Sequence, residues 1–388
     1  MKEIASGRMV YRGGWLDSIR AHTVIIELFI RSQIGKFTKV KLRRLRLIDV
    51  RLIAILALLA SGTARGEGEL RLGGAINLFS RYGYLSISMK VVPRNDTDSK
   101  WLYREPTIDV FKDLSAYTLA PEDKNRIKVF EGDFHMEFCD NLRQLLQAYF
   151  RDFSFEKLDR PWRAFSGSWS RTGMAKHLGV DSNFINGHHC YVLVRVSRHR
   201  ETSRMRPVDT DDVDLEDEVA RGTMDVIPGN ESSVSQFVKN FGSHYVVSYT
   251  TGNSLYQVFV FSPQIYSRIK ERLKTKGVSA LSTVELSSYF SPWYAEHIGQ
   301  IQSASGNLTT QAWAAENLRV HFYFFTYPSL LKLHAEKDLL RTLNNLLGNE
   351  AMLALDLRTL APAFKDPERR GWFLEVIDNY LKLWETNM

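Results

Sequence analysis

The fold is decided by the stretch Phe241-Gly242-Ser243-His244-Tyr245, which is followed after six residues by Gly252-Asn253. Residues 232–240, just before it, place apolar side chains at helical spacing, with Ser232 at the expected cap. Residues 254–261, just after it, have the composition and pattern of a strand. We therefore expect a helix, a tight glycine turn and a strand, with the second glycine inside that strand.

Each of the two glycines has a mechanical interpretation. Gly242 permits a backbone geometry that a side chain would obstruct where the helix turns into the strand. Gly252 bends a strand and admits the close approach of another segment. His244 and Tyr245 are expected on opposite faces of the strand. The pattern predicts a hinge in a bent sheet, with His244 as a buried structural histidine that fixes the turn by a hydrogen bond.

This arrangement resembles the signature of the membrane attack complex/perforin (MACPF) family, which reads aromatic-Gly-Thr/Ser-His-Tyr/Phe, six residues, Gly-Gly. Three positions depart from the usual family residues: Phe241 replaces Tyr or Trp, Ser243 replaces Thr, and Asn253 replaces the second Gly. Asparagine tolerates a left-handed conformation, so the bend can persist. The resemblance implies an α+β fold, in which a bent antiparallel sheet is flanked by helical clusters.

In the family the sheet has four strands, and the two helical clusters can unfurl into membrane-spanning hairpins. The resemblance places the strands near residues 152–155, 190–196, 245–261 and 318–326. It places the clusters at residues 160–188 and 263–316. The first cluster carries many charges and lacks the alternation of apolar and polar residues that a spanning hairpin needs. The second cluster places five charged residues close together between Lys270 and Lys276, so neither cluster is typical of a barrel precursor.

Periodicity away from the signature predicts three further helices. They cover residues 134–150, 330–348 and 371–384. The basic residues from Arg198 to Arg206 and the acidic run from Asp209 to Glu218 are interpreted as a solvated loop. The acidic run lacks the ligand spacing and the glycine of a calcium loop.

The basic charge of the chain is concentrated at its start. Residues 1–64 hold 12 Lys and Arg against 4 Asp and Glu, while the remaining residues hold 39 against 40. A basic run followed by the apolar core 52–60 and by small residues predicts a signal peptide, cleaved near Ala64. A nuclear-localisation or nucleic-acid patch would not need that apolar run, so we expect a secreted, extracellular protein without nucleic-acid partners.

Two other features of the sequence can be interpreted if the protein is exported. Asn95, Asn230 and Asn307 each begin an Asn-x-Ser/Thr acceptor for glycosylation. Cys139 and Cys190 are the two cysteines, and in an oxidising compartment one disulfide between them is expected, with two buried free thiols as the alternative. A Cys/His metal site at Cys190 is disfavoured, because the spacings of zinc sites are absent from the sequence.

The expected organisation is a leader over residues 1–64, a MACPF-like domain over 65–348 and a C-terminal helical extension over 349–388. We expect no catalytic residues, metal or cofactor, since the motifs of nucleophile elbows, phosphate loops and zinc peptidases are absent from the sequence. Over most of the chain the resemblance is closer to one secreted member of the family, and this closer resemblance implies a non-enzymatic factor in embryonic terminal patterning. Its expected partners are the Torso receptor and its ligand, or the extracellular matrix, with contact at a membrane surface. The alternative is a membrane-inserting, pore-forming effector.

Overall fold

The structure is a computed structural model, and Arg65–Met388 forms one compact unit. It describes residues 68–69, 71–79, 91–93, 101–103, 108–119, 133–167, 169–276, 282–334 and 336–386. The predicted leader, its cleavage site and the acceptor Asn95 lie outside the described residues.

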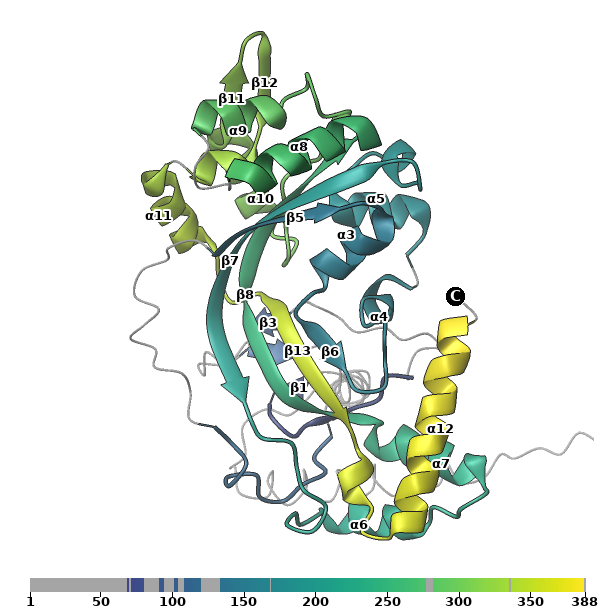
Figure 1. The fold of residues 1–388 in the computed structure, drawn as a ribbon. Coiled ribbons are helices and arrows are strands. Elements are labelled where there is room, and N and C mark those ends of the chain that lie inside the picture. Colours follow the sequence, from purple (N-terminus) through teal and green to yellow (C-terminus); the bar gives the residue numbers. More distant parts are fainter. Residues whose placement is uncertain are drawn as a thin grey trace, which may run out of the picture. The chain divides into compact units, whose positions relative to one another are not determined.

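A curved sheet forms the centre of this unit (Figure 1). Its strands follow the order β5 (Asp133–Cys139), β7 (Cys190–Arg204), β8 (His244–Phe261), β13 (Ala351–Thr359) and β6 (Phe153–Phe155). The short strands β2 (Ala75–Ile76), β9 (His297–Ile298) and β10 (Gln302–Ser303) also pair with β8. The predicted α+β architecture, a bent sheet flanked by helical clusters, is confirmed. The predicted antiparallel pairing has one exception at the edge, where β6 runs parallel to β13.

Three sequence-based assignments are corrected by the sheet. The predicted helix 134–150 is divided into β5 and the shorter helix α3 (Leu142–Tyr149). The predicted fourth strand, 318–326, instead forms a separate hairpin, β11 (Arg319–Phe322) and β12 (Phe325–Pro328). Its place in the sheet is taken by β13, which lies within the predicted helical extension. The proposed boundary at residue 348 therefore cuts through the sheet.

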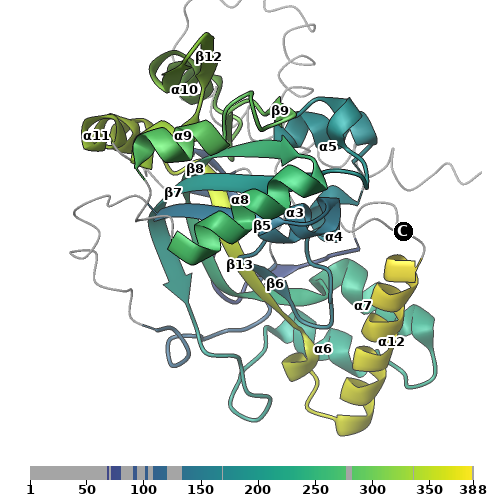
Figure 2. The ribbon, with the colours of Figure 1, turned by 45° about the horizontal axis from the view of Figure 1, so that its top comes forward.

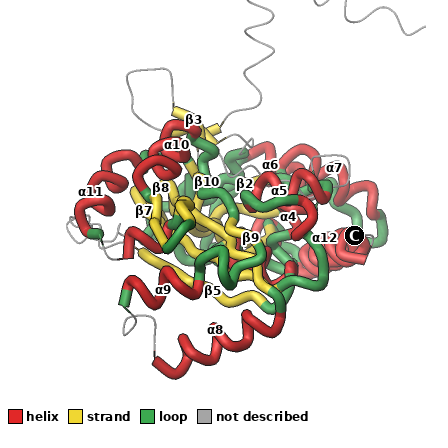
Figure 3. The backbone as a smooth tube through the Cα atoms, turned by 90° about the horizontal axis from the view of Figure 1, so that it is seen from above, coloured by secondary structure: helices red, strands yellow, loops and turns green. Residues whose placement is uncertain are grey.

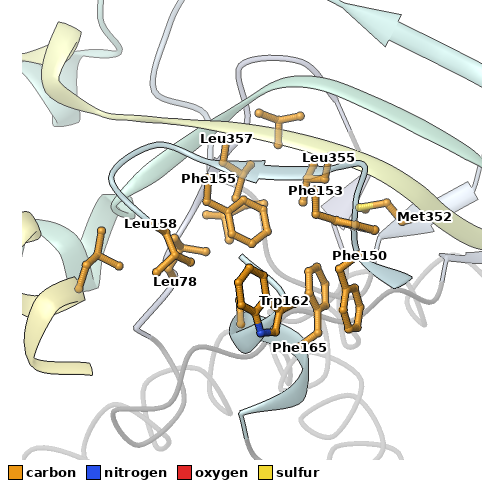
Figure 4. Packing of buried hydrophobic residues seen from close by; sticks show 14 of the residues in the cluster. Leu78, Phe150, Phe153, Phe155, Leu158, Trp162, Phe165, Met352, Leu355 and Leu357 are labelled. Carbon is orange, nitrogen blue, oxygen red and sulfur yellow. The ribbon is translucent and has the colours of Figure 1, made fainter. Parts of the chain in front are cut away.

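Hydrophobic residues on one face of the sheet form a large core. The helices that pack on this core come from parts of the sequence before and after the signature. The helices around this core are α3, α4 (Arg163–Ser166), α5 (Arg171–Leu178), α6 (Asp217–Met224), α7 (Glu231–Phe241) and α12 (Pro367–Thr386). Aromatic rings from α3, β6 and α4 pack closely here, with Phe150 stacked on Phe165 at 4.6 Å between ring centroids (Figure 4).

The opposite face of the sheet is covered by a second core. It is closed by α8 (Pro263–Lys276), α9 (Thr283–Tyr289), α10 (Leu308–Asn317), the 3₁₀ turn η4 (Leu330–His334) and α11 (Lys337–Leu346). Figure 2 shows α8 and α9 over the strands, and Figure 3 shows both helices on one side of the sheet. Successive side chains along a strand point to opposite faces of the sheet. Val192 and Val194 therefore enter this second core, whereas Tyr191 and Leu193 enter the first. Because both faces are covered there, residues 190–196 of β7 and 255–261 of β8 are nearly continuous apolar runs.

The remaining elements are short. They are β1 (Gly68–Glu69), β3 (Val91–Pro93) and β4 (Trp101–Tyr103), which form a separate small sheet, and the 3₁₀ turns η2 (Ser182–Phe184) and η5 (Ala361–Ala363). Among the helices in the described part of the chain, none has the length and apolar character needed to cross a membrane.

Candidate functional site

The first half of the signature forms the turn from α7 into β8, as predicted. The cap at the start of α7 is Asn230 rather than Ser232, since the Asn230 side chain accepts from the backbone N–H of Ser232. Gly242 ends the helix with a φ of 93°, in a region that side chains disfavour. A Cβ at this position would lie 3.1 Å from the backbone of Ile76 in β2. Both the turn and the close contact therefore require glycine.

His244 is fully buried, and both of its ring nitrogens have partners. Nε2 lies 3.2 Å from the carbonyl oxygen of Glu156, just after β6. Because a carbonyl only accepts, Nε2 carries the proton of the neutral ring, and Nδ1 accepts from the Ser243 hydroxyl at 3.0 Å. Burial lowers the pKa of His244 to about 4, against the partial opposition of Glu156. The histidine is thus a neutral structural connection between β8 and β6, consistent with the structural role predicted from sequence.

The neighbours of this histidine hold three further segments together. The Ser243 hydroxyl also accepts from the backbone N–H of Leu78 at 3.1 Å. The carboxylate of Glu156 accepts from both the backbone N–H and the hydroxyl of Thr359, at 2.7 and 3.0 Å. Sequence analysis missed Glu156 and Thr359, because nothing local to residues 156 or 359 indicates that they meet. We call Ser243, His244, Glu156 and Thr359 the turn network.

The aromatic residues of the signature are packing residues. Tyr245 is buried in the first core with its ring edge-on to Phe111 at 5.3 Å, and its hydroxyl accepts from the backbone N–H of Val208. Phe241 packs on Phe237 within α7, 5.2 Å between ring centroids. Tyr245 thus anchors the turn network to the segments around Phe111 and Val208, and Phe241 anchors it to α7.

The second half of the signature marks the bend of the sheet. Both neighbouring strands lose register beside Gly252: β7 between His199 and Glu201, and β13 between Met352 and Ala354. Such one-residue bulges bend a strand and increase its twist. A Cβ on Gly252 would lie 2.0 Å from the carbonyl oxygen of Arg198. The predicted close approach at Gly252 is therefore present, and its partner is the backbone of β7.

Asn253, which stands where the family usually has a second glycine, is fully buried and heavily hydrogen-bonded. Its Oδ1 accepts from the Ser303 hydroxyl and from the backbone N–H groups of Ser254 and Ser305. Its Nδ2 donates to the Ser305 hydroxyl at 2.9 Å and to the Glu350 carboxylate at 3.5 Å. We call Asn253, Ser303, Ser305 and Glu350 the bend network. It connects β8 to the segment that leads into α10 and to the start of β13.

Two arginines at the bend correct the interpretation of residues 198–206 as solvated loop. Arg198 and Arg200 lie in β7, and their guanidinium groups donate to the carbonyl oxygens of Asn344 and Leu347 at the end of α11. Carbonyls at a helix C-terminus lack partners within the helix and carry partial negative charge. Burial lowers the pKa of both arginines. The basic residues therefore tie the second helical cluster to the bend.

The predicted disulfide between Cys139 and Cys190 is absent, and both cysteines are buried free thiols. The register of β5 and β7 places Cys139 opposite Tyr191, one residue from Cys190. Because side chains alternate across a strand, Cys139 enters the first core and Cys190 the second. The two thiols therefore lie on opposite faces of the sheet. Burial raises the pKa of Cys139 to about 12, which disfavours its reactive thiolate.

We expect both thiols to be free in the purified protein. Denaturing it without reductant in iodoacetamide should add two carbamidomethyl groups to the intact mass, because no bond withholds either sulfur. A matched sample that is reduced first should give the same mass. A non-reduced digest that yields a peptide linked through Cys139 and Cys190 would contradict this arrangement.

The two described glycosylation acceptors differ in environment. Asn230 is exposed at the start of α7. Asn307 is half-buried at the start of α10, where its Nδ2 donates to the Glu350 carboxylate at 3.2 Å. No group of three His, Cys, Asp or Glu side chains that could hold a metal occurs within the described ranges.

Comparisons with known proteins find structural similarity only. No protein-family model and no curated protein sequence matches the chain. GNIP1Aa from Chromobacterium piscinae is similar with a TM-score of 0.41 and 11% identity, over 81% of this chain and 57% of that one. A MAC/perforin-domain protein from Bacteroides thetaiotaomicron has a TM-score of 0.36 and 8% identity, over 79% of this chain and 59% of that one. Astrotactin-2, a vertebrate-specific, perforin-like membrane protein, has a TM-score of 0.31 and 11% identity, over 79% of this chain and 96% of that one.

Proposed function

We propose that this chain is a perforin-like, secreted and non-enzymatic factor that acts outside the cell as a folded scaffold, without inserting into membranes. The proposal is supported by a family signature whose residues all have structural roles in the turn and at the bend. In this interpretation His244 holds the fold together and does no proton chemistry.

The bend network is the observation that carries the non-inserting part of the proposal. A perforin-like protein inserts by opening its sheet at the bend and releasing the second cluster. Here that movement would break the hydrogen bonds of the buried Asn253 with Ser303, Ser305 and Glu350. It would also expose the carbonyls of α11 that Arg198 and Arg200 now cap. Leaving such buried groups without partners costs about 1–3 kcal/mol for each group.

The finer part of the proposal rests on sequence resemblance. From about residue 70 to its end, the chain resembles Torso-like, a secreted MACPF protein. We therefore propose that it acts locally to enable the Torso receptor tyrosine kinase to respond to its ligand in embryonic terminal patterning. Its direct partners would be that receptor system or the extracellular matrix.

A paired assay tests both parts of the proposal. Purified protein should release no dye from liposomes that a known perforin empties, and it should raise Torso phosphorylation in cells that express the receptor and its ligand. Dye release by the wild-type protein would instead establish the pore-forming alternative. Absence of any effect on phosphorylation would contradict the signalling role.

Asn253→Gly sharpens the assay, because it restores the usual family residue and removes the centre of the bend network. We expect it to lower the free energy of unfolding by about 2–3 kcal/mol without producing dye release. Asn240→Ala is the matched control, since Asn240 is exposed on α7. Dye release by Asn253→Gly alone would mean that the bend network is a removable block on insertion.

A further inference from the structure

The hairpin of β11 and β12 presents aromatic side chains at its tip. Phe322 pairs with Phe325, so the loop between the strands consists of Tyr323 and Phe324 alone. Tyr323 has a φ of 51°, in the left-handed region. Two-residue hairpin loops ordinarily use Gly, Asn or Asp at such a position, because an aromatic residue there is strained. Tyr323 therefore adopts a strained backbone conformation at this tip, where two aromatic rings lie side by side in the sequence.

These rings belong to a larger exposed patch. Phe324 is 95% exposed and Tyr323 80%. Trp293, in the loop after α9, is 63% exposed, and its ring stands edge-on to Phe325 at 6.2 Å. Five of the eleven large hydrophobic side chains that are exposed in the described residues lie on this hairpin or in the Trp293 loop beside it: Trp293, Tyr294, Tyr323, Phe324 and Phe325. A concentration of this kind marks an interaction surface.

The shape and chemistry of the patch favour a lipid surface as its occupant. Figure 1 shows the hairpin projecting beyond the helices of the second cluster, so its tip is convex and offers no groove for a peptide. Each strand has four residues, which gives another chain little free edge to pair with. Tryptophan and tyrosine combine an apolar ring with a polar atom, and they are enriched where a bilayer meets water.

Charge on a neighbouring helix complements an anionic bilayer. Figure 1 places α8 at the same end of the unit as the hairpin. The outer surface of α8 exposes Arg268, Arg272 and Lys274, with Glu271 as the acidic residue among them. Basic residues near a surface of anionic lipids are attracted to the headgroups.

We propose that the tip formed by Tyr323 and Phe324, with Trp293 beside it, docks the folded protein on a phospholipid bilayer that contains anionic lipids. The rings enter the headgroup region, and α8 supplies the electrostatic attraction. Docking of this kind needs no opening of the sheet. It would hold the folded factor on a lipid surface, which goes beyond the proposed signalling function.

The test is flotation with vesicles of phosphatidylcholine containing phosphatidylserine. Wild-type protein should float with them, and Tyr323→Gly/Phe324→Ser should lower the partition coefficient by about tenfold or more. Glycine takes the positive φ without strain, so this variant should keep its thermal midpoint. Met224→Ser/Ile227→Ser is the matched control, because both residues are exposed apolar side chains outside the patch. It should bind like the wild type.

Three results would overturn the docking proposal. They are a folded wild-type protein that stays unbound, a tip variant that binds as well as the wild type, and a control variant that loses binding equally. If wild-type protein fails to float but the tip variant loses Torso phosphorylation, the patch contacts a protein instead. If wild-type protein floats without affecting phosphorylation, docking stands and the signalling function fails. The protein should bind vesicles of pure phosphatidylcholine more weakly. Equal binding to both kinds of vesicle would contradict the electrostatic role proposed for α8.

Discussion

Gly252→Ala is expected to lower the yield of folded protein sharply and to destabilise the protein that is recovered. The added Cβ would lie 2.0 Å from the carbonyl oxygen of Arg198, a backbone atom that cannot move without shifting β7. Forcing atoms into a packed interior costs about 3 kcal/mol, and more where the backbone must move. Stability of a whole domain is only about 5–15 kcal/mol. Urea unfolding and the yield of folded protein measure the effect, and valine should be more destabilising than alanine.

Gly371→Ala is the matched control for this experiment. Gly371 lies inside α12, and a Cβ there would meet nothing within 4 Å. Alanine in a helix should stabilise by about 0.5–1 kcal/mol. If Gly252→Ala unfolds at the same urea concentration as the wild type, the close approach of β7 and β8 at the bend is wrong.

One consequence is that Gly252 cannot serve as a probe of hinge motion. Even alanine, the milder substitution, interferes with folding before any movement of the sheet can be observed. Asn253 is the better probe, because removing its side chain deletes hydrogen bonds without adding an atom to the bend.

The second large effect is expected on the pH dependence of stability, and it arises from His244. Its pKa is 6.5 in the reference state and about 4 in the folded protein. Between these values the unfolded chain binds the extra proton, so stability is lost as pH falls from 6.5 towards 4. The loss approaches about 3 kcal/mol, since one unit of pKa corresponds to roughly 1.4 kcal/mol. In wild-type protein this loss adds to the effects of other groups.

His244→Gln isolates that contribution. The variant should be less stable than the wild type at pH 7, by about 1–3 kcal/mol, because the turn network loses its ring. The difference between the two should shrink as the pH is lowered to 4.5. His188→Gln, at an exposed histidine, should keep the wild-type pH profile. A His244→Gln protein whose stability falls with pH as steeply as that of the wild type would show that His244 does not titrate as its burial predicts.

Sequence analysis succeeded where the signal is local. The helix before Gly242, the strand after it and the need for glycine at positions 242 and 252 follow from spacing and side-chain size within twenty residues or so. The α+β architecture followed from the resemblance that these residues carry. These features depend on the chain's immediate neighbours, so one sequence is enough to predict them.

The errors arose where contacts between residues far apart in the sequence determine the secondary structure. In β5, Phe134 and Phe138 have the spacing of a helix, but with Met136 they also alternate as in a strand. Pairing with β7 selects the strand. The leucines of β13 are typical of helices, and β8 imposes the extended form. The bend network was equally inaccessible, since Asn253 and Glu350 are far apart in sequence. The predicted fourth strand, residues 318–326, instead contributes to the exposed aromatic hairpin.

The position of β13 between β8 and β6 has a consequence for biosynthesis. On the ribosome, β6 is made about 200 residues before β13, its only neighbour in the sheet among the described strands. Over residues 244–252, the central strand β8 likewise lacks its neighbour β13 until residues 351–359 have been made. The sheet therefore cannot be completed before that point of translation. Nascent protein must be kept from pairing these open edges with other chains until β13 is available.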